Sequence, residues 1–287
     1  MTGVLPVDKP EGPTSHDVVA MARRALGIRR IGHTGTLDPF ATGLLLLCVG
    51  QATRLSEYLT GLDKRYEGTA RLGVATDSLD RTGRVIAERD WSDHTEAEIR
   101  DAFESQTGSI LQAPPAFSAK KVAGRRAYER ARAGEAVAPD PVPVVIHSLE
   151  VTAIEGDLVR FRIHCSSGTY VRAVARDAGD RLGVGAHLSA LRRIAIGGFD
   201  AAGALPIEGL EDADAVAAAL VPPLDALSHL PRMELDDHDV ERVGHGRALP
   251  ASDWAPAAGP VVLTAGSRLV ALAEVDGRTV RPRKVFL

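Results

Sequence analysis

Residues 32–49 read GHTGTLDPFATGLLLLCV, and this stretch decides the fold. Its second half, residues 44–49, is a continuous apolar run, which predicts a strand buried in the protein core. The loop before it carries three glycines, three threonines, His33 and a single carboxylate, Asp38. Because Pro39 fixes φ and the buried strand holds the loop, we expect a rigid polar loop around one acid. That layout is typical of a site with one essential carboxylate, although Asp-Pro pairs also begin ordinary turns.

The flanking segments carry helix and strand signals. Thr14 or Ser15 can cap a helix that has Asp17 in its first turn and ends at Gly27. Thr95 and Glu98 form a capping box for a later helix. The other predicted elements are a helix at 53–59, a strand at 66–75, strands at 142–154 and 158–165 joined by a hairpin at 155–157, and a helix at 170–182.

The charge of the chain is unevenly distributed. Residues 199–239 carry ten acids and one base, a net charge of −9 against −4 for the whole chain, which leaves +5 for the rest. Cations gather at 120–132 and at 278–284. Segregated charge favours a basic face that could bind a polyanion, but a charge run is also typical of a solvated surface. The prolines at 222, 223 and 231 predict a linker within the acidic stretch.

Six motifs occur in the order found in one known family. Besides the stretch at 32–49 they are KPEG at 9–12, KRY at 64–66 with RLG at 71–73, QAPPAFSAKK at 112–121, CSSGTYVR at 165–172, and GAH at 185–187 with LRR at 191–193. Together they resemble the TruB family of tRNA pseudouridine synthases over about residues 4–193. The family isomerises uridine-55 in the T-loop of tRNA, so the resemblance implies an isomerase that modifies tRNA.

The resemblance also implies a fold. We expect an α/β (α+β) pseudouridine synthase domain at 1–231, built on a large, mainly antiparallel mixed sheet, with a basic RNA-binding arm at about 112–138. The segment 243–286 resembles a PUA domain, a small β-barrel that binds RNA, which places a second domain at 232–287. Its signals are a helix near 236–243 and strands at 261–263, 269–275 and 279–286, with a hairpin turn at Asp276-Gly277.

By resemblance, three residues carry the chemistry. Asp38 is the catalytic carboxylate, Arg172 is its ion-pair partner, and Tyr66 stacks on the flipped uracil and helps proton transfer. From residue type alone, Arg172 is equally a surface cation, and a lone strand tyrosine such as Tyr66 is usually a core residue. Attack on C1′, addition to the uracil ring and proton abstraction towards a glycal all remain open, and each requires Asp38 ionised.

The resemblance also implies roles for other residues in substrate binding. Tyr170 lines the pocket, Leu191 faces the base, and His33 stacks within the T-loop without transferring protons. The phosphate-contact candidates are Lys9, Lys64 and Lys120, each of which is equally a solvated cation. The chain departs from the family pattern at Phe117, where the family has tyrosine, and at Ser167, where it has lysine.

Composition and motifs also bear on the metal, the cofactor, the localisation and the partner of the protein. The two cysteines, Cys48 and Cys165, lack metal-ligand spacing, and the reaction needs neither a metal nor a cofactor, so none is expected. Without a signal peptide or a membrane-length apolar run, we expect a cytoplasmic monomer whose partner is tRNA, contacted at the T-arm and, through the C-terminal domain, at the acceptor end. The alternatives are an RNA-folding factor with secondary chemistry and a phosphate-binding enzyme, although a P-loop motif is absent.

Overall fold

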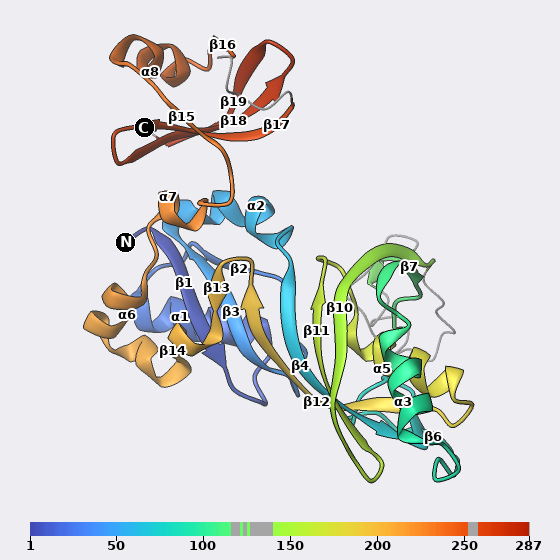
Figure 1. The fold of residues 1–287 in the computed structure, drawn as a ribbon. Helices are drawn as coiled ribbons and strands as arrows, with labels where there is room; N and C mark the ends of the chain where they lie inside the picture. Colours follow the sequence, from blue (N-terminus) through green and yellow to red (C-terminus); the bar gives the residue numbers. More distant parts are fainter. Residues whose placement is uncertain (116–120, 123–124, 127–139, 252–257, 287) are drawn as a thin grey trace.

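A computed structural model describes residues 1–115, 121–122, 125–126, 140–251 and 258–286. Figure 1 shows a large twisted sheet with helices packed at both of its ends, and a smaller sheet attached near α2 and α7. The main sheet has ten strands, most of them joined in the order β14-β1-β3-β12-β4-β11-β10-β7. Its neighbours are antiparallel except for β1–β14 and β12–β3, which are parallel. The predicted mixed α/β fold with a mainly antiparallel sheet is therefore confirmed.

The apolar run forms β3 (Thr42–Val49), which is buried on both faces. Leu44, Leu46 and Cys48 enter one hydrophobic cluster, while the alternate residues enter a second cluster. All the residues from Leu44 to Val49 are fully buried. Since successive side chains of a strand point to opposite faces, only a strand covered on both sides requires such a continuous run.

The strand β12 (Ala186–Ile196) joins the two halves of the main sheet. It pairs antiparallel with β4 (Lys64–Leu72) along most of its length. It also pairs parallel with β3 at Arg192↔Thr42 and Arg193↔Gly43. Residues from β3 and from β4 therefore approach each other at this junction, and the polar loop at 35–41 lies immediately before it.

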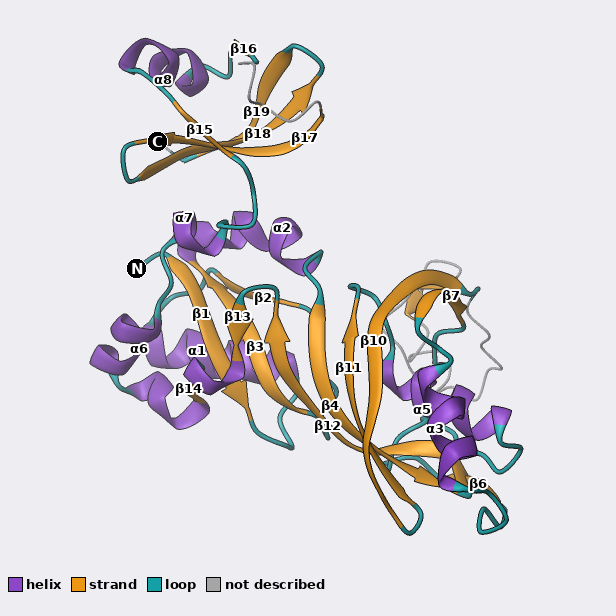
Figure 2. Cartoon of the chain, viewed as in Figure 1, coloured by secondary structure: helices purple, strands orange, loops and turns teal. Residues whose placement is uncertain are grey.

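Helices pack against both halves of the main sheet (Figure 2). The helix α1 (Ser15–Leu26) is capped by Thr14, one of the two predicted caps, whose side chain forms a capping box with Asp17, and the helix ends at Gly27, whose φ is 64°. The helices α3 (Glu96–Glu104) and α5 (Val171–Arg181) share one hydrophobic cluster with β4, β10, β11 and β12. The sequence predictions for these three helices are confirmed.

The remaining elements complete both sheets. The strands are β1 Gly3–Lys9, β2 Ile31–Thr34, β5 Val74–Thr76, β6 Val85–Glu88, β7 Gly108–Gln112, β8 Lys121–Val122, β9 Arg125–Arg126, β10 Val142–Glu155, β11 Leu158–Cys165, β13 Phe199–Asp200, β14 Leu205–Pro206, β15 Arg232–Glu234, β16 Leu249–Pro250, β17 Ala258–Ala265, β18 Arg268–Asp276 and β19 Thr279–Val285. The helices are α2 Ser56–Thr60, α6 Ala213–Ala219, α7 Pro223–Ala226 and α8 Asp237–Gly244, with 3-10 helices at Gly50–Leu55, Ala201–Gly203 and Ile207–Glu211.

Three local predictions need correction. The helix expected at 53–59 is a 3-10 helix followed by the short α2. The strand expected at 66–75 stops at Leu72, because Gly73 adopts a φ of 77° that breaks the extended backbone. The prolines at 222 and 223 do not lie in a linker, since Pro223 begins α7 and the following Ala226 and Leu227 are buried against the core.

The C-terminal unit is a curled five-stranded sheet, a half-barrel with the order β15-β17-β18-β19-β16 (Figure 1). The expected hairpin joins β18 and β19 through Gly277, whose φ is 60°. This unit packs on the main-sheet part of the protein, where the guanidinium carbon of Arg54 lies 4.5 Å from the centre of the Phe286 ring. Lys284 forms an ion pair of 2.7 Å with Glu57. Among the described residues, no helix is long and apolar enough to cross a membrane.

Gly43 provides a test of the β3–β12 junction. Its φ is +100°, and a Cβ there would lie 2.3 Å from the carbonyl oxygen of Arg193. We expect Gly43→Ala to lower the free energy of unfolding by about 1–3 kcal/mol, measured by urea denaturation. Gly198→Ala is the matched control, because a Cβ there meets no atom within 4 Å. Equal stability of the two variants would contradict the tight junction.

Candidate active site

The loop at 35–41 is fixed to the protein by backbone hydrogen bonds. The amide of Leu37 donates to Ser15 Oγ at 2.9 Å, and the carbonyl of Pro39 accepts from the Gly12 amide at 2.9 Å. The amide of Ala41 donates to the carbonyl of Asp38 at 3.1 Å, so Asp38-Pro39 does begin a turn. The turn and the functional interpretation are compatible, because this turn is what fixes the direction of the Asp38 side chain.

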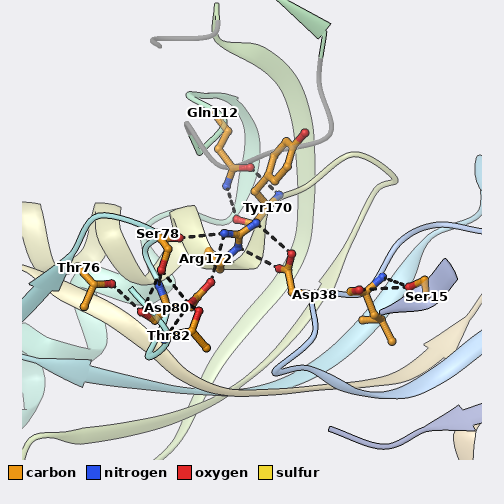
Figure 3. A network of polar contacts seen from close by, with 10 residues as sticks. Ser15, Asp38, Thr76, Ser78, Asp80, Thr82, Gln112, Tyr170 and Arg172 are labelled. Atoms are coloured by element: carbon orange, nitrogen blue, oxygen red, sulfur yellow. Dashed lines mark hydrogen bonds and ion pairs between the residues drawn. The ribbon is translucent and has the colours of Figure 1, made fainter. Parts of the chain in front are cut away.

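Arg172 forms a two-pronged ion pair with Asp38 (Figure 3). Its Nε lies 3.0 Å from Asp38 Oδ2, and a terminal nitrogen donates to Oδ1 at 3.2 Å. The Arg172 side chain is 7% exposed, whereas the Asp38 side chain is 34% exposed. The interpretation of Arg172 as a surface cation is therefore wrong. The carboxylate is reachable from solvent, while its partner is enclosed by protein.

Asp80 holds the far side of the same guanidinium, and sequence reasoning missed it. Its Oδ2 lies 3.3 Å from Arg172 Nη1, and its side chain is 5% exposed. The other oxygen, Oδ1, accepts from Ser78 Oγ at 2.8 Å and from Thr82 Oγ1 at 2.6 Å (Figure 3). In the sequence, Asp80 lies in a polar loop that looks like an ordinary turn, so no local signal distinguishes it.

The charges around Asp38 act on its pKa in opposite directions. Burial raises the pKa of Asp38 above its ordinary value, and the nearby Asp80 carboxylate adds to the rise. The Arg172 guanidinium and, more weakly, the Lys9 ammonium lower the same pKa. The ionised state of Asp38 therefore depends on Arg172, because this cation offsets the penalty of burying the carboxylate.

Tyr66 and Leu191 lie in the apolar cluster that also includes residues of the Asp38 loop (residues 35–41). Both are 8% exposed, and they share this cluster with Leu37 and Phe40 from the loop itself. Burial raises the pKa of the Tyr66 phenol, and the Arg193 guanidinium, which also hydrogen-bonds it, opposes the rise. The phenol is therefore neutral at physiological pH and can donate a hydrogen bond.

Arg193 connects both ends of the Asp38 loop to β12. It is 1% exposed, its Nε donates to the Leu44 carbonyl at 2.7 Å, and a terminal nitrogen donates to the Gly35 carbonyl at 3.1 Å. The family resemblance included Arg193 in a motif but gave it no role. The structure shows that it fixes the loop on which Asp38 lies.

His33 lies at the edge of the site on β2. Its ring packs edge-on against His16, with ring centres 5.1 Å apart, and its Nδ1 has no hydrogen-bond partner among the described residues. Burial, together with His16 and Arg193, lowers the pKa of His33 to about 4. A neutral imidazole at physiological pH fits the expected stacking role and not proton transfer.

The other expected binding residues take different positions. The phenol ring of Tyr170 extends away from the Asp38 carboxylate in Figure 3, and its amide donates to Gln112 Oε1 at 2.8 Å. Lys9 is fully buried, and its Nζ donates to the carbonyls of Pro10, Pro13 and Pro39.

Lys64 is buried likewise, and its Nζ donates to the carbonyls of Thr60 and Leu62. Burial lowers the pKa of both Lys9 and Lys64 to about 8. In this structure both lysines hold backbone, and phosphate contact stays a prediction for them. Lys120 and most of the predicted arm at 112–138 lie outside the described residues.

Groups able to hold a metal do not include Asp38. In the described part of the chain, the clusters of histidine and acid side chains with suitable spacing are Asp63–His147–His164 and Asp236–His238–Asp239. The Asp38 site offers one partly exposed carboxylate and a guanidinium that the enclosed Asp80 holds from its far side. Such a site can stabilise positive charge, act as a nucleophile or accept a proton.

The family comparison agrees with this geometry. The N-terminal domain of TruB family pseudouridylate synthase matches residues 23–171, and the C-terminal domain of tRNA pseudouridylate synthase B matches residues 172–228. The boundary between the two matches falls at Arg172, so each contributes one partner of the ion pair. The second match extends through residue 228 and so includes much of the acidic stretch.

Relatives match over nearly the whole chain. A tRNA pseudouridine synthase B from Solibacter usitatus is 44% identical and covers 96% of each chain. One from Geobacillus thermodenitrificans is 45% identical and covers 100% of each chain. A solved Cbf5–Nop10–Gar1 complex contains a chain that is 28% identical with a TM-score of 0.78, aligned over 99% of this chain and 85% of that one.

A second solved structure, an H/ACA RNP bound to a substrate RNA containing 2′-deoxyuridine, has a TM-score of 0.76 at 28% identity, covering 99% of this chain and 85% of that chain. The fold and the site thus define an enzyme of the pseudouridylate synthase class. The chain belongs to the TruB family of pseudouridylate synthases.

Replacing Arg172 and replacing Asp80 should move the pKa of Asp38 in opposite directions. Arg172→Met removes the cation that lowers the pKa, so the acid limb of the pH–rate profile should shift to higher pH. Asp80→Asn removes an anion that raises it, so the limb should shift to lower pH. We expect rates to fall about 100-fold or more for Arg172→Met and about 10-fold for Asp80→Asn in single-turnover assays. Shifts of both variants in the same direction would contradict this electrostatic arrangement.

Proposed function

We propose that the enzyme isomerises uridine-55 in the T-loop of tRNA to pseudouridine, acting as a cytoplasmic monomer without a cofactor. The observation that carries this proposal is the single carboxylate Asp38, held by the enclosed Arg172 beside the buried Tyr66. Relatives aligned along the whole chain bear the name tRNA pseudouridine synthase B, which supports tRNA as the substrate.

The reaction changes no overall composition. The N1–C1′ bond of uridine breaks, the uracil ring turns, a C5–C1′ bond forms, the C5 proton leaves, and a proton is gained at N1. Asp38 acts first, as an anion, either on C1′ or the ring or by abstracting a proton. Arg172 keeps that anion available, since a guanidinium beside a carboxylate favours its charged form.

The base must leave the RNA stack before these atoms can be reached. We assign Leu191 and Tyr66 to the two faces of the extruded uracil, because both line the apolar cluster next to the Asp38 loop. We assign the neutral His33 to stacking within the T-loop in place of the displaced base. Tyr170 lines the same pocket once RNA is bound.

The C-terminal unit would extend the RNA contact. We infer a catalytic domain at 1–231 and an RNA-binding half-barrel at 232–287, with the half-barrel contacting the acceptor end of tRNA. Support comes from Arg278, Arg281 and Arg283, which are exposed on or beside β19. Lys284 is not counted with these exposed arginines, because its ammonium already pairs with Glu57.

Asp38→Asn tests the chemistry directly. The substitution is nearly isosteric and removes the charge, so we expect turnover to be abolished while tRNA affinity stays within a few-fold of wild type. Pseudouridine formed in an unmodified tRNA transcript would be mapped by chemical derivatisation. Turnover within about tenfold of wild type, which equals about 1.4 kcal/mol of barrier, would falsify the catalytic role.

Arg281→Gln combined with Arg283→Gln tests the acceptor-end contact. We expect full-length tRNA to bind more weakly, by about 1–3 kcal/mol, with a flatter dependence of affinity on salt. A T-arm minihelix lacks the acceptor region beyond the stem, so its modification rate should not change. The matched control is Glu57→Gln, which alters the Lys284 pair without removing an exposed cation. An equal loss of activity on full-length tRNA and on the minihelix would contradict contact between these arginines and the acceptor end.

A further inference from the structure

Two histidines and one aspartate converge outside the Asp38 site. Asp63 lies between α2 and β4, His147 is on β10, and His164 is on β11. Asp63 Oδ2 lies 3.1 Å from His147 Nε2 and 3.7 Å from His164 Nε2. One ligand atom from each residue lies within 4.8 Å of the other two. Three segments that are distant in sequence therefore place metal-binding atoms close together.

The backbone explains why these side chains meet. The β10–β11 ladder has a register shift between Ile146 and Ser148, which leaves His147 as the extra residue of a β-bulge. A bulge turns a side chain out of the regular alternation, and here it brings the His147 ring to 4.6 Å, centre to centre, from that of His164. The carbonyl of Asp63 accepts from the Gly197 amide at 2.9 Å, which fixes the third residue.

The distances and donor atoms match a zinc site. Tetrahedral zinc with bonds of about 2.0–2.1 Å separates its ligand atoms by about 3.3–3.4 Å, and the two measured separations bracket that value. Two imidazole nitrogens and one carboxylate oxygen suit zinc and similar transition metals, whereas magnesium and calcium prefer oxygen donors. Partial exposure of all three side chains, 31–44%, leaves a fourth position open to water.

We propose that Asp63, His147 and His164 bind one Zn²⁺ ion, with water as the fourth ligand. The ion would join Asp63, the residue immediately before β4, to His147 within β10 and to His164 near the end of β11. Asp63 lies three residues before Tyr66. It takes no part in the Asp38 chemistry, because neither Asp38 nor Arg172 belongs to the cluster. This site goes beyond the proposed function and does not depend on it.

The contact between Asp63 and His147 also has a simpler interpretation. The competing interpretation is a simple ion pair between Asp63 and protonated His147, which would bind no metal.

Zinc titration of the full-length, tag-free protein tests the site. After a chelator wash and desalting, we expect calorimetry to show one equivalent of Zn²⁺ bound, and Co²⁺ to give the visible absorption of a tetrahedral complex. His147→Ala, His164→Ala and the nearly isosteric Asp63→Asn should each weaken zinc binding at least about tenfold. Zinc should also raise the melting temperature of the wild type and not that of His147→Ala/His164→Ala.

His238→Ala is the matched control, because His238 lies in the other described cluster of histidine and acid side chains. It should leave zinc binding unchanged. The proposal is overturned by the absence of a saturable equivalent, by binding that survives in Asp63→Asn and both histidine variants, or by loss of binding in His238→Ala alone.

Discussion

The guanidinium of Arg172 lies between two carboxylates, and the candidate site depends on this contact. Asp38 accepts hydrogen bonds from Nε and one terminal nitrogen of Arg172, and Asp80 accepts from the other terminal nitrogen. Removing one partner of an enclosed ion pair is strongly destabilising, because it leaves an uncompensated charge away from water. The pairing thus brings together the loop after β2, the loop after β5 and the first turn of α5. It also lowers the pKa of the more exposed carboxylate, Asp38, against the effect of burial.

The loop that carries Asp38 is rigid for reasons outside the loop. The buried strand β3 holds its end, and Arg193 donates to carbonyls at both of its ends. Lys9 directs a buried ammonium towards three carbonyls, one of them Pro39. An active site gains most when its charged groups are already positioned before the substrate arrives. Buried cations at Lys9 and Arg193 therefore fix the backbone around the Asp38 carboxylate.

The same cations show how residue type can mislead. Lysines near an RNA site are natural candidates for phosphate contacts, yet Lys9 and Lys64 are buried and bonded to backbone. Exposed arginines on β19 remain available for RNA, whereas Lys284 on the same strand is engaged by Glu57 and lies against the Tyr58 ring. Charge counted along the sequence therefore overstates the cations that can reach a phosphate, because some of them support the fold.

The sequence by itself determined the buried strand, the capped helices, the hairpins at Gly156 and Gly277, and the family, because these depend on local periodicity, on turn residues and on motifs in order. It also pointed to Asp38, Tyr66 and Arg172, through resemblance. Only the tertiary structure decided that Asp80 shares the Arg172 guanidinium, that Arg193 fixes the loop, and that Asp63, His147 and His164 converge. These contacts join residues up to 158 positions apart, and no local pattern records which distant side chains the β12 junction and a β-bulge bring together.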